Sequence, residues 1–463
     1  MTKTYTDDVL PSDFRAAFKD ADIRGVYPSE IDEVVAYRVA RACVEEFALS
    51  EVIVARDMRV SSPSLRAAFI AGVRDSGADA IDVGLVGTPA LYYASGSYDA
   101  FGVMITASHN PKDYNGLKLV RAGAVPLTNK TGLAAIKKRI VKGEFITPPK
   151  PGALKTRSIE RAYHKYVESR VPLAPKKPLR IVIDAGNGMA ATLQPLLDRL
   201  PFTVTPLFFT LDGTFPNRDS NPTLRKNQTA ITHTLRQGSY DLGVSFDGDA
   251  DRLAFFDEKG TYINSAVVGA MLVRYLLEIY PHATFVYTVF TSKIYEETIK
   301  QYGGTAVRAR VGHAFIKEVM RTRDAQFACE HSAHFYFKDN YYADSGILTL
   351  LYVAAAYTTQ REAGETFSQF LRPFQKYYQT EEVLVRVQNK RATLESLAQY
   401  YEAQSPEAVV RYDGVTVRFA DYWFTVKPSV TEDALKYVVE APKKVTAIAG
   451  QKEVRQFLER FAQ

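Results

Sequence analysis

Short runs of apolar residues alternate with amphipathic helical patterns along most of the chain. The first apolar runs predict buried strands at residues 52–55, 80–83 and 101–105. Between them the pattern predicts a helix over 61–76, with Pro63 in its first turn and Gly77 just past its end, and a second helix that opens at 91–94. Strands that alternate with helices are typical of a mostly parallel sheet covered by helices on both faces.

The same alternation restarts twice. A Pro-rich segment at 145–153 marks the first break, and Lys259-Gly260 marks the second. The second stretch predicts strands at 179–184, 203–209 and 242–246 and a helix over 189–200. The third predicts strands at 284–289, 305–308 and 327–330 and helices over 294–302 and 315–321. These stretches indicate three α/β domains.

The last part of the chain has a different pattern. It predicts strands at 382–387, 414–419, 422–426 and 436–440, with short connections and fewer helices, which is typical of an antiparallel α+β module. Length alone suggests about three domains for 463 residues. The pattern predicts four: three α/β domains at 1–150, 151–260 and 261–370, and an α+β domain at 371–463.

Composition excludes several classes of protein. Apolar residues make up 46% and charged residues 24% of the chain, which is ordinary for a globular protein and excludes a disordered one. The two cysteines, Cys43 and Cys329, cannot form a disulfide framework, and neither lies in a Cys-x-x-Cys pattern. The net charge of +6 is too small for a dedicated nucleic-acid binder and suits small acidic ligands.

No segment predicts a membrane span or a secretion signal. The most apolar long stretch, residues 265–280, is interrupted by Arg274 and Glu278, and the first residues of the chain are polar. We therefore expect a cytoplasmic protein that has neither a nucleic acid nor a membrane as a partner.

The segment Thr106-Ala107-Ser108-His109-Asn110-Pro111 directly follows the predicted strand at 101–105. Loops at the carboxyl ends of parallel strands are where ligands bind in such sheets. A small hydroxyl beside a base in a tight turn suits a presented nucleophile. The alternative is an ordinary polar turn, and the six residues alone do not decide between the two.

Three carboxylates alternate in Asp247-Gly248-Asp249-Ala250-Asp251-Arg252, between two apolar runs. Carboxylates at this spacing repel one another, and a hard divalent cation relieves the repulsion. An EF-hand is a poor fit because Arg252 stands where that loop needs glycine. We favour a Mg²⁺ loop beside a phosphate, with Asp247, Asp249 and Asp251 as ligands, over a solvated acidic hairpin tip.

A glycine loop, Asp184-Ala185-Gly186-Asn187-Gly188, lies between a predicted strand and a predicted helix. It matches the weak dinucleotide fingerprint and raises the alternative of a nicotinamide-dependent dehydrogenase. No acidic residue closes a second strand about 20 positions further on, as that fingerprint requires. We therefore favour a turn whose glycines serve tight strand-to-helix packing.

Two further polar loops are weak signals when taken alone. Cys329-Glu330-His331-Ser332-Ala333-His334 could hydrogen-bond sugar hydroxyls, and Lys427-Pro428-Ser429-Val430-Thr431-Glu432 could cradle a phosphate. The usual explanation of either is a surface loop.

Together these segments resemble the α-D-phosphohexomutase family, in its phosphomannomutase/phosphoglucomutase branch, across essentially the whole chain. The matching segments are Asp22–Gly25, Thr106–Pro111 with Tyr114–Lys118, Asp212–Asn217, Asp247–Arg252, Arg310–His313, Cys329–His334 and Lys427–Glu432. The resemblance implies three α/β mixed-sheet domains and a C-terminal α+β lid around one central cleft.

The resemblance also implies a reaction. Ser108 would carry a phosphoryl group and exchange it with a hexose 1-phosphate or 6-phosphate, of mannose or glucose, through a 1,6-bisphosphosugar. Mg²⁺ would be held by Asp247, Asp249, Asp251 and the Ser108 side chain, and glucose 1,6-bisphosphate or an equivalent would load the enzyme. The chain would act as a monomer or homodimer.

Further roles follow from the resemblance. Arg24, His109, Lys118 and Arg252 would surround the reacting groups, and either Lys118 or His334 would be the general acid/base. The substrate would be bound by Arg252, Lys293, His313, Glu330, Ser332, His334, Lys427, Ser429 and Thr431.

The chain departs from the family pattern at several positions. Ala21, Cys329 and Ala333 replace residues that are usual there, and in the lid loop Lys427 stands for arginine, Val430 for glycine or asparagine and Asp433 for proline. Lysine lacks the guanidinium fork, so we expect a weaker phosphate grip by the lid. A phosphoglucosamine mutase and a catalytically weak phosphosugar-binding protein remain alternatives, with the dehydrogenase as a distant third.

Overall fold

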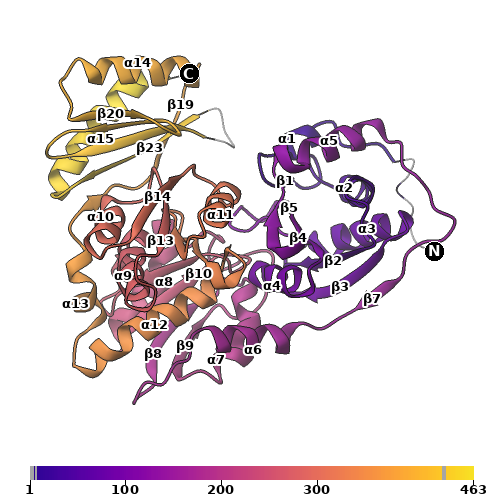
Figure 1. Ribbon diagram of the computed structural model, residues 1–463, viewed down its shortest axis with the longest axis horizontal. Coiled ribbons are helices and arrows are strands. Elements are labelled where there is room, and N and C mark those ends of the chain that lie inside the picture. Colours follow the sequence, from indigo (N-terminus) through magenta and orange to yellow (C-terminus); the bar gives the residue numbers. More distant parts are fainter. Residues whose placement is uncertain (1–4, 6–7, 430–433, 463) are drawn as a thin grey trace. The chain divides into compact units, whose positions relative to one another are not determined.

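The computed structural model describes residue 5 and residues 8–429 and 434–462. The chain divides into two compact units. Figure 1 shows the ribbon coloured along the sequence, with the helices and strands labelled. The first unit comprises Met1–Ile263 and Ser332–Phe367, and the second comprises Asn264–His331 and Ser368–Gln463. Among the described residues, no helix has the length and apolar character needed to cross a bilayer.

The first sheet of the first unit is mixed. Its strands are ordered β1-β5-β4-β2-β3-β7, and β6 pairs with β5. The strands are β1 (Ile23–Val26), β2 (Glu51–Arg56), β3 (Asp79–Leu85), β4 (Phe101–Ile105), β5 (Tyr114–Arg121), β6 (Val125–Pro126) and β7 (Leu154–Thr156). The predicted strands at 52–55, 80–83 and 101–105 are confirmed and lie parallel, whereas β5 runs antiparallel to β4 and β1. Because β7 pairs with β3, this sheet continues beyond residue 150.

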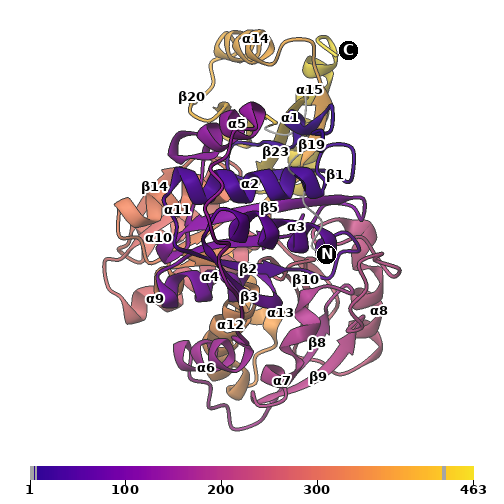
Figure 2. The ribbon, with the colours of Figure 1, turned by 90° about the vertical axis from the view of Figure 1, so that its right-hand side faces the viewer.

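Helices cover both faces of the first sheet, which explains why β4 is buried along its whole length. The helices that come first in the chain are α1 (Phe14–Ala17), α2 (Glu33–Glu46), α3 (Ser62–Asp75), α4 (Thr88–Tyr98), α5 (Leu133–Lys142) and α6 (Glu160–Arg170). The apolar sides of α2, α3 and α5 share one core with alternate residues of the strands, and α4 packs against β4 on the other face (Figure 2). Gly72 permits the close contact of α3 with α2, because a Cβ there would lie 2.3 Å from the Tyr37 carbonyl oxygen.

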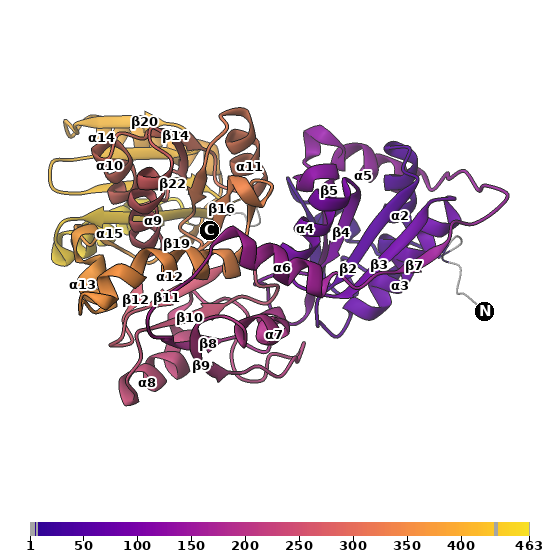
Figure 3. The ribbon, with the colours of Figure 1, turned by 60° about the horizontal axis from the view of Figure 1, so that its bottom comes forward.

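The second sheet of this unit has the order β12-β11-β10-β8-β9 (Figure 3). The strands are β8 (Leu179–Asp184), β9 (Phe202–Leu207), β10 (Leu242–Phe246), β11 (Leu253–Phe256) and β12 (Tyr262–Ile263). β8 is parallel to β9 and β10, and the remaining pairs are antiparallel. The helix α8 (Thr229–Gln237) packs its apolar side on β8 and β10.

The predicted helix over 189–200 is wrong in part. Residues Met189–Leu193 form a 3₁₀ turn, and only α7 (Gln194–Leu197) is α-helical. Pro195 lies in the first turn of α7, the place where a missing N–H costs no hydrogen bond. In a continuous helix its ring would clash with the carbonyl one turn earlier, so the helix cannot extend through it.

Three more elements complete the first unit. They are the antiparallel pair β16 (Phe335–Phe337) and β17 (Ala343–Asp344), and the long helix α12 (Gly346–Glu362). α12 begins at Ser345, whose side chain accepts a hydrogen bond from the Leu348 N–H and so caps the helix.

The second unit contains two sheets. The first has the parallel strands β13 (Thr284–Thr288), β14 (Thr305–Ala309) and β15 (Phe327–Cys329), with helices α9 (Ser265–Ile279), α10 (Lys293–Gln301) and α11 (His313–Thr322). The division between the units falls at the first residue of the short helix α13 (Phe367–Leu371).

The last sheet is antiparallel throughout, as the sequence predicts. Its order is β18-β23-β22-β21-β20, and β19 pairs with β23. The strands are β18 (Tyr378–Gln379), β19 (Val383–Arg386), β20 (Ala408–Arg411), β21 (Val415–Arg418), β22 (Trp423–Pro428) and β23 (Ala434–Ala441). The helices α14 (Lys390–Glu402) and α15 (Lys444–Glu459) pack on one apolar face of it (Figures 1 and 2).

Glu440 links the last sheet to the start of helix α10, which belongs to the other sheet's layer in the second unit. Its side chain lies on β23, is buried, and accepts a hydrogen bond of 2.9 Å from the Lys293 N–H at the start of α10. Burial raises the pKa of Glu440 to about 7, although the hydrogen bonds from Lys293 and Ser292 act in the opposite direction. Below about pH 7 the folded protein therefore favours the neutral carboxyl.

We expect stability to fall between about pH 5 and pH 7 because of Glu440. A raised folded-state pKa contributes stability that is complete below the unfolded pKa and is lost as pH rises through the folded one. The change corresponds to at most about 3 kcal/mol. In Glu440→Gln the amide oxygen still accepts from Lys293 but does not ionise, so its melting temperature should depend less on pH. Parallel pH profiles for the two proteins in calorimetry would contradict this role.

Candidate active site

Ser108 lies in a tight turn between β4 and β5 of the first unit. The turn is closed by a 3.0 Å hydrogen bond from the Asn110 N–H to the Ala107 carbonyl. Ser108 has a φ of 52°, in the left-handed region, and its N–H donates to the Thr106 hydroxyl at 2.9 Å. The residue is 2% exposed. The turn therefore holds one hydroxyl in an unusual backbone conformation, which is common at functional sites.

The three aspartates lie between β10 and β11, and the turn brings them together. Ligand oxygens of Asp247, Asp249 and Asp251 lie within 4.8 Å of one another, and all three side chains are buried. The Ser108 hydroxyl donates to the Asp247 carboxylate at 2.8 Å. The predicted nucleophile and the predicted metal loop thus meet, although they are 139 residues apart.

Lys118 on β5 compensates part of this negative charge. Its ammonium lies 2.7 Å from Asp249 Oδ2 and 2.6 Å from Asp251 Oδ2. Burial alone would lower the pKa of Lys118, but the two carboxylates hold it well above its usual value.

The pKa values of two of these aspartates are shifted in opposite directions. Burial, followed by repulsion from Asp251 and Asp249, raises the pKa of Asp247 well above its usual range. Burial also acts on Asp251, but Lys118 and His334 outweigh it and hold the pKa of Asp251 well below that range.

The donor set fits a hard divalent cation. Three carboxylates and a hydroxyl supply the oxygen ligands that Mg²⁺ prefers. Within the described residues, the buried atoms Asp249 Oδ1 and Asp251 Oδ1 have no hydrogen-bond donor. Two carboxylate oxygens are thus available for a metal even while Lys118 is bound.

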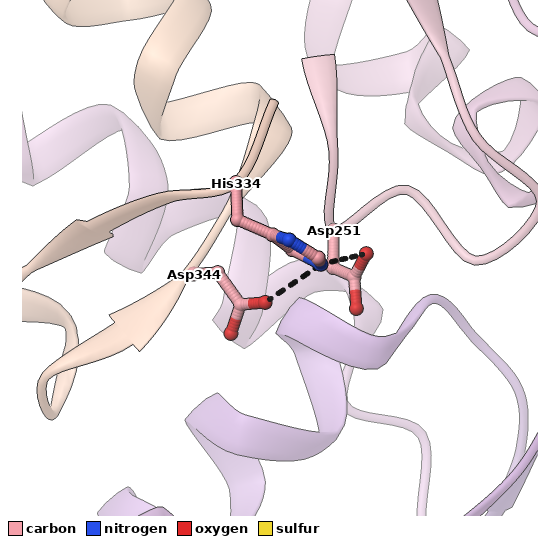
Figure 4. Close-up of side chains that lie close together, drawn as sticks. All are labelled: Asp251, His334 and Asp344. Carbon is pink, nitrogen blue, oxygen red and sulfur yellow. Dashed lines mark ion pairs between the residues drawn. The ribbon is translucent and has the colours of Figure 1, made fainter. Parts of the chain in front are cut away.

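His334 lies against the same loop (Figure 4). Its Nε2 lies 3.5 Å from Asp251 Oδ1 and 3.7 Å from Asp344 Oδ2. Arg252 Nε donates to that nitrogen at 3.1 Å, so Nε2 accepts and the proton is on Nδ1, which faces the Ser332 hydroxyl at 2.9 Å. Asp251, His334 and Asp344 could also group around a metal, but the Arg252 guanidinium occupies the nitrogen. We therefore place the metal at the three aspartates.

His109 and Arg24 are near the serine turn, as predicted. Arg24 donates to the Asn110 side chain at 2.9 Å and pairs with Asp22 at 2.5 Å. Burial, together with the cations of Arg252 and Arg24, lowers the pKa of His109 well below its usual value. His109 is therefore neutral, and Arg24 is anchored to the turn.

Sequence reasoning missed Arg59, which holds the serine turn. Its side chain is completely buried, and its guanidinium donates to four carbonyl oxygens at 2.7–2.9 Å. These belong to Ser108, Asn110, Pro111 and Tyr114. Asp57 accepts from the Arg59 N–H at 3.0 Å, and both residues follow the carboxyl end of β2. That position in a parallel sheet is the signal that could have identified them.

Thr88 was also missed. At the start of α4, its hydroxyl donates to Asp249 Oδ2 at 2.5 Å and its N–H donates to the Asp249 carbonyl at 3.0 Å. The contact is long-range, because 161 residues separate the two. Thr88 thus fixes the middle carboxylate of the loop from the first sheet.

The glycine loop packs on the metal loop, whereas the sequence suggested that its glycines serve strand-to-helix packing. A Cβ on Gly188 would lie 2.8 Å from the Gly248 carbonyl oxygen. The neighbouring Met189 N–H donates to that same oxygen at 2.9 Å. The close approach of two backbones explains the glycine without a dinucleotide.

The remaining predicted residues are in both units. The division falls between His331 and Ser332, inside the predicted sugar loop, so Glu330 is in the second unit. Glu330 accepts from the Gly312 N–H at 3.2 Å, directly before His313 at the start of α11. Thr431 lies outside the described residues, as do Val430 and Asp433. Ser429 is buried.

The two predicted phosphate-binding lysines are bound by protein groups. Lys427 pairs with Asp413 at 3.1 Å, and both side chains are buried. Lys293 lies 3.5 Å from Glu297, and its ammonium is 4.8 Å from the centroid of the Trp423 ring. Lys427 is buried in its ion pair, whereas 44% of the Lys293 side chain is exposed.

Comparison with known families gives matches to three consecutive segments. Residues 15–147 match phosphoglucomutase/phosphomannomutase, alpha/beta/alpha domain I. Residues 161–260 match domain II of the same description, and residues 264–377 match domain III. These segments contain the strands that flank the two loops: β4 and β5 around the serine turn, and β10 and β11 around the aspartate loop.

Individual proteins are similar along nearly the whole chain. "Phosphohexose mutases" of Xanthomonas campestris pv. campestris is 36% identical over 92% of this chain and 94% of that protein. A phosphomannomutase of Salmonella typhimurium is 35% identical over 92% and 94%. The solved structure of a phosphoglucomutase/phosphomannomutase family protein from Burkholderia thailandensis has a TM-score of 0.86, with 28% identity over 97% of this chain and 99% of that one.

We expect Arg59→Lys to reduce catalytic turnover by about 100-fold, because a displacement of a reacting group by about 1 Å costs that much. An ammonium keeps the charge beside Asp57 but cannot reach four carbonyls, so the turn shifts. The measurement is kcat and KM, with kcat expected to fall more than KM rises. Arg66→Lys is the matched control, because Arg66 donates to Asp82 away from the turn. Equal effects of the two variants would contradict the assignment.

Proposed function

We propose a phosphoserine mechanism for this chain, which belongs to the phosphoglucomutase/phosphomannomutase family and is an intramolecular phosphotransferase acting on hexose phosphates. The observation that supports it is the 2.8 Å hydrogen bond from the Ser108 hydroxyl to Asp247 within the cluster of three aspartates. A nucleophile and an oxygen-rich metal site in direct contact are the parts that phosphoryl transfer requires.

In the proposed reaction, phosphorylated Ser108 gives its phosphoryl group to the free hydroxyl of a hexose 1-phosphate. The bond from Ser108 Oγ to phosphorus breaks, the bond from the sugar oxygen to phosphorus forms, and the sugar hydroxyl loses its proton. The product is a 1,6-bisphosphosugar. Its other phosphoryl group then returns to Ser108 and leaves the hexose 6-phosphate. We propose mannose and glucose as the sugars, since mutases named for hexose and mannose substrates are the similar proteins.

Asp247, Asp249 and Asp251 would hold Mg²⁺, with the Ser108 side chain as a further ligand, and the bound ion would neutralise charge on the transferring phosphoryl group. The chain's own cations add to this. Arg24 is anchored at the turn beside Ser108, and Arg252 is held between Asp247 and His334. Transfer of this kind depends on positioning and on compensating charge.

The contacts of Lys118 and His334 bear on which of them is the general acid/base. The Lys118 ammonium donates to two carboxylates, so it has no lone pair with which to accept a proton. His334 Nε2 lies against the same loop and accepts a hydrogen bond from Arg252 Nε, so it can take a proton once the sugar hydroxyl replaces that donor. We therefore assign the proton of the sugar hydroxyl to His334 Nε2, and an electrostatic role to Lys118.

The scheme predicts that Ser108 is the only residue that takes up a phosphoryl group. Intact mass spectrometry before and after incubation with glucose 1,6-bisphosphate should show the gain of one such group. Ser108→Ala should abolish the gain, and Ser64→Ala, on α3 outside the turn, should retain it. A mutase without this gain, or a gain that persists in Ser108→Ala, would contradict the scheme. Binding of mannose 1-phosphate with no turnover would instead indicate a phosphosugar-binding protein.

The assignment of His334 predicts a loss of rate without a loss of binding. In His334→Gln the side-chain oxygen can still accept from Arg252, but it cannot take a proton from the sugar. We expect kcat to fall by about 10²- to 10⁴-fold. KM for mannose 1-phosphate and for glucose 1-phosphate should change little. Near-normal kcat in this variant would return the role to Lys118.

A further inference from the structure

The substrate of the proposed reaction carries a phosphate that does not react with Ser108, and this phosphate needs a cation. The sequence suggests Lys427 for that role. In the structure the Lys427 ammonium pairs with Asp413 at 3.1 Å, and only 5% of the lysine side chain and 9% of the aspartate side chain are exposed. A buried lysine beside a buried carboxylate is a neutral pair and attracts a dianion only weakly.

The backbone conformation of one turn brings Asp413 close to Lys427. Asp413 lies in the turn between β20 and β21, with a φ of 47°. Gly414 follows with a φ of 118°, and a Cβ there would lie 2.3 Å from the Val426 carbonyl oxygen and 2.7 Å from Lys427 Cβ. The turn can approach the end of β22 this closely because residue 414 is glycine.

Asp413 also holds the segment 310–313 of the same unit. The carboxylate oxygen that faces Lys427 accepts a hydrogen bond of 2.8 Å from the Val311 N–H. The next residue, Gly312, donates to Glu330 at 3.2 Å. One carboxylate therefore joins β22 to the loop whose Gly312 N–H donates to the proposed sugar-binding Glu330.

Arg310 stands on this loop in a different setting from Lys427. Half of its side chain, 51%, is exposed. Its guanidinium carbon lies 4.2 Å from the centroid of the Phe315 ring, and its Nε is 3.9 Å from Asp413 Oδ1, which is beyond hydrogen-bond distance. Stacking on a ring fixes the plane of a guanidinium and leaves its N–H edge for an anion.

We infer that Arg310, rather than Lys427, supplies the cation that binds the substrate phosphate remote from Ser108, and that Asp413 keeps Lys427 out of that role. This inference rests on the proposed function. Asp413 faces two cations, Arg310 and Lys427, so one carboxylate compensates only one of the two positive charges. Arg310 is the exposed cation of the two. The ligand class is a phosphate monoester dianion, which a guanidinium can bind through two N–H groups.

The test compares Arg310→Met with Lys427→Met. We expect Arg310→Met to raise KM for mannose 1-phosphate and glucose 1-phosphate by about 30-fold, the effect of losing a charge-assisted hydrogen-bonded contact. Arg310→Lys should lie between this variant and the unaltered protein, because it keeps the charge and loses the fork. Lys427→Met should raise KM less than about threefold and lower the melting temperature, because it leaves Asp413 buried without its partner.

A second measurement separates this inference from the reaction scheme. Calorimetric titration of mannose 1-phosphate into Ser108→Ala measures binding, so its result for Arg310 does not depend on whether Ser108 is the nucleophile. Arg310→Met in that background should weaken binding by a factor similar to the rise in KM. Unchanged binding in Arg310→Met, or an equal loss in Lys427→Met, would overturn the inference. Adding Asp413→Asn to Lys427→Met should restore the melting temperature, and a further loss of stability would contradict the neutral pair.

Discussion

The repulsion among three buried carboxylates is the constraint on which the first unit depends. At the separations within the cluster, each ionised pair costs about 3–4 kcal/mol at an effective dielectric constant of about 20. Groups from several elements offset this repulsion. β5 contributes the Lys118 ammonium, the start of α4 contributes the Thr88 hydroxyl, and the serine turn contributes the Ser108 hydroxyl. The charge thus specifies how the loops of the first two sheets meet, and the same charge makes the site suitable for a divalent cation.

Each loop at this site is held by backbone groups as well as by side chains. Arg59 binds the carbonyls of the serine turn. Gly188 allows the glycine loop to lie directly against the aspartate loop, and Gly248 allows the serine turn to do the same. Such contacts leave little room for the reacting hydroxyl to move. This rigidity agrees with a reaction in which positioning and electrostatics do most of the work.

Much of the fold could be predicted from the sequence because the central strands are buried on both faces. Continuous apolar runs such as Phe101–Ile105 therefore signal strands directly. The segment after Gly188 was harder, because its helical pattern does not show that Pro195 breaks it into a 3₁₀ turn and a short helix. The site motifs were visible because each is continuous in the sequence: Ser108 lies in one short loop and the three aspartates lie in another.

The pairings between distant loops could not be predicted. Arg59 acts through backbone carbonyls about fifty positions away, and carbonyls carry no side-chain signature. The partner of Lys427 is Asp413, on a neighbouring turn whose approach depends on Gly414. Lys118 and His334 are equivalent candidates in the sequence, and only the two carboxylates around the lysine distinguish them.

The backbone at Ser108 also restricts which nucleophile the site can use. Threonine carries the same hydroxyl, but a residue branched at Cβ is a genuine outlier at the φ of 52° found here. The conformation of the turn therefore favours serine over threonine at this position. In a protein that keeps this turn, stereochemistry therefore restricts the residue proposed to carry the phosphoryl group.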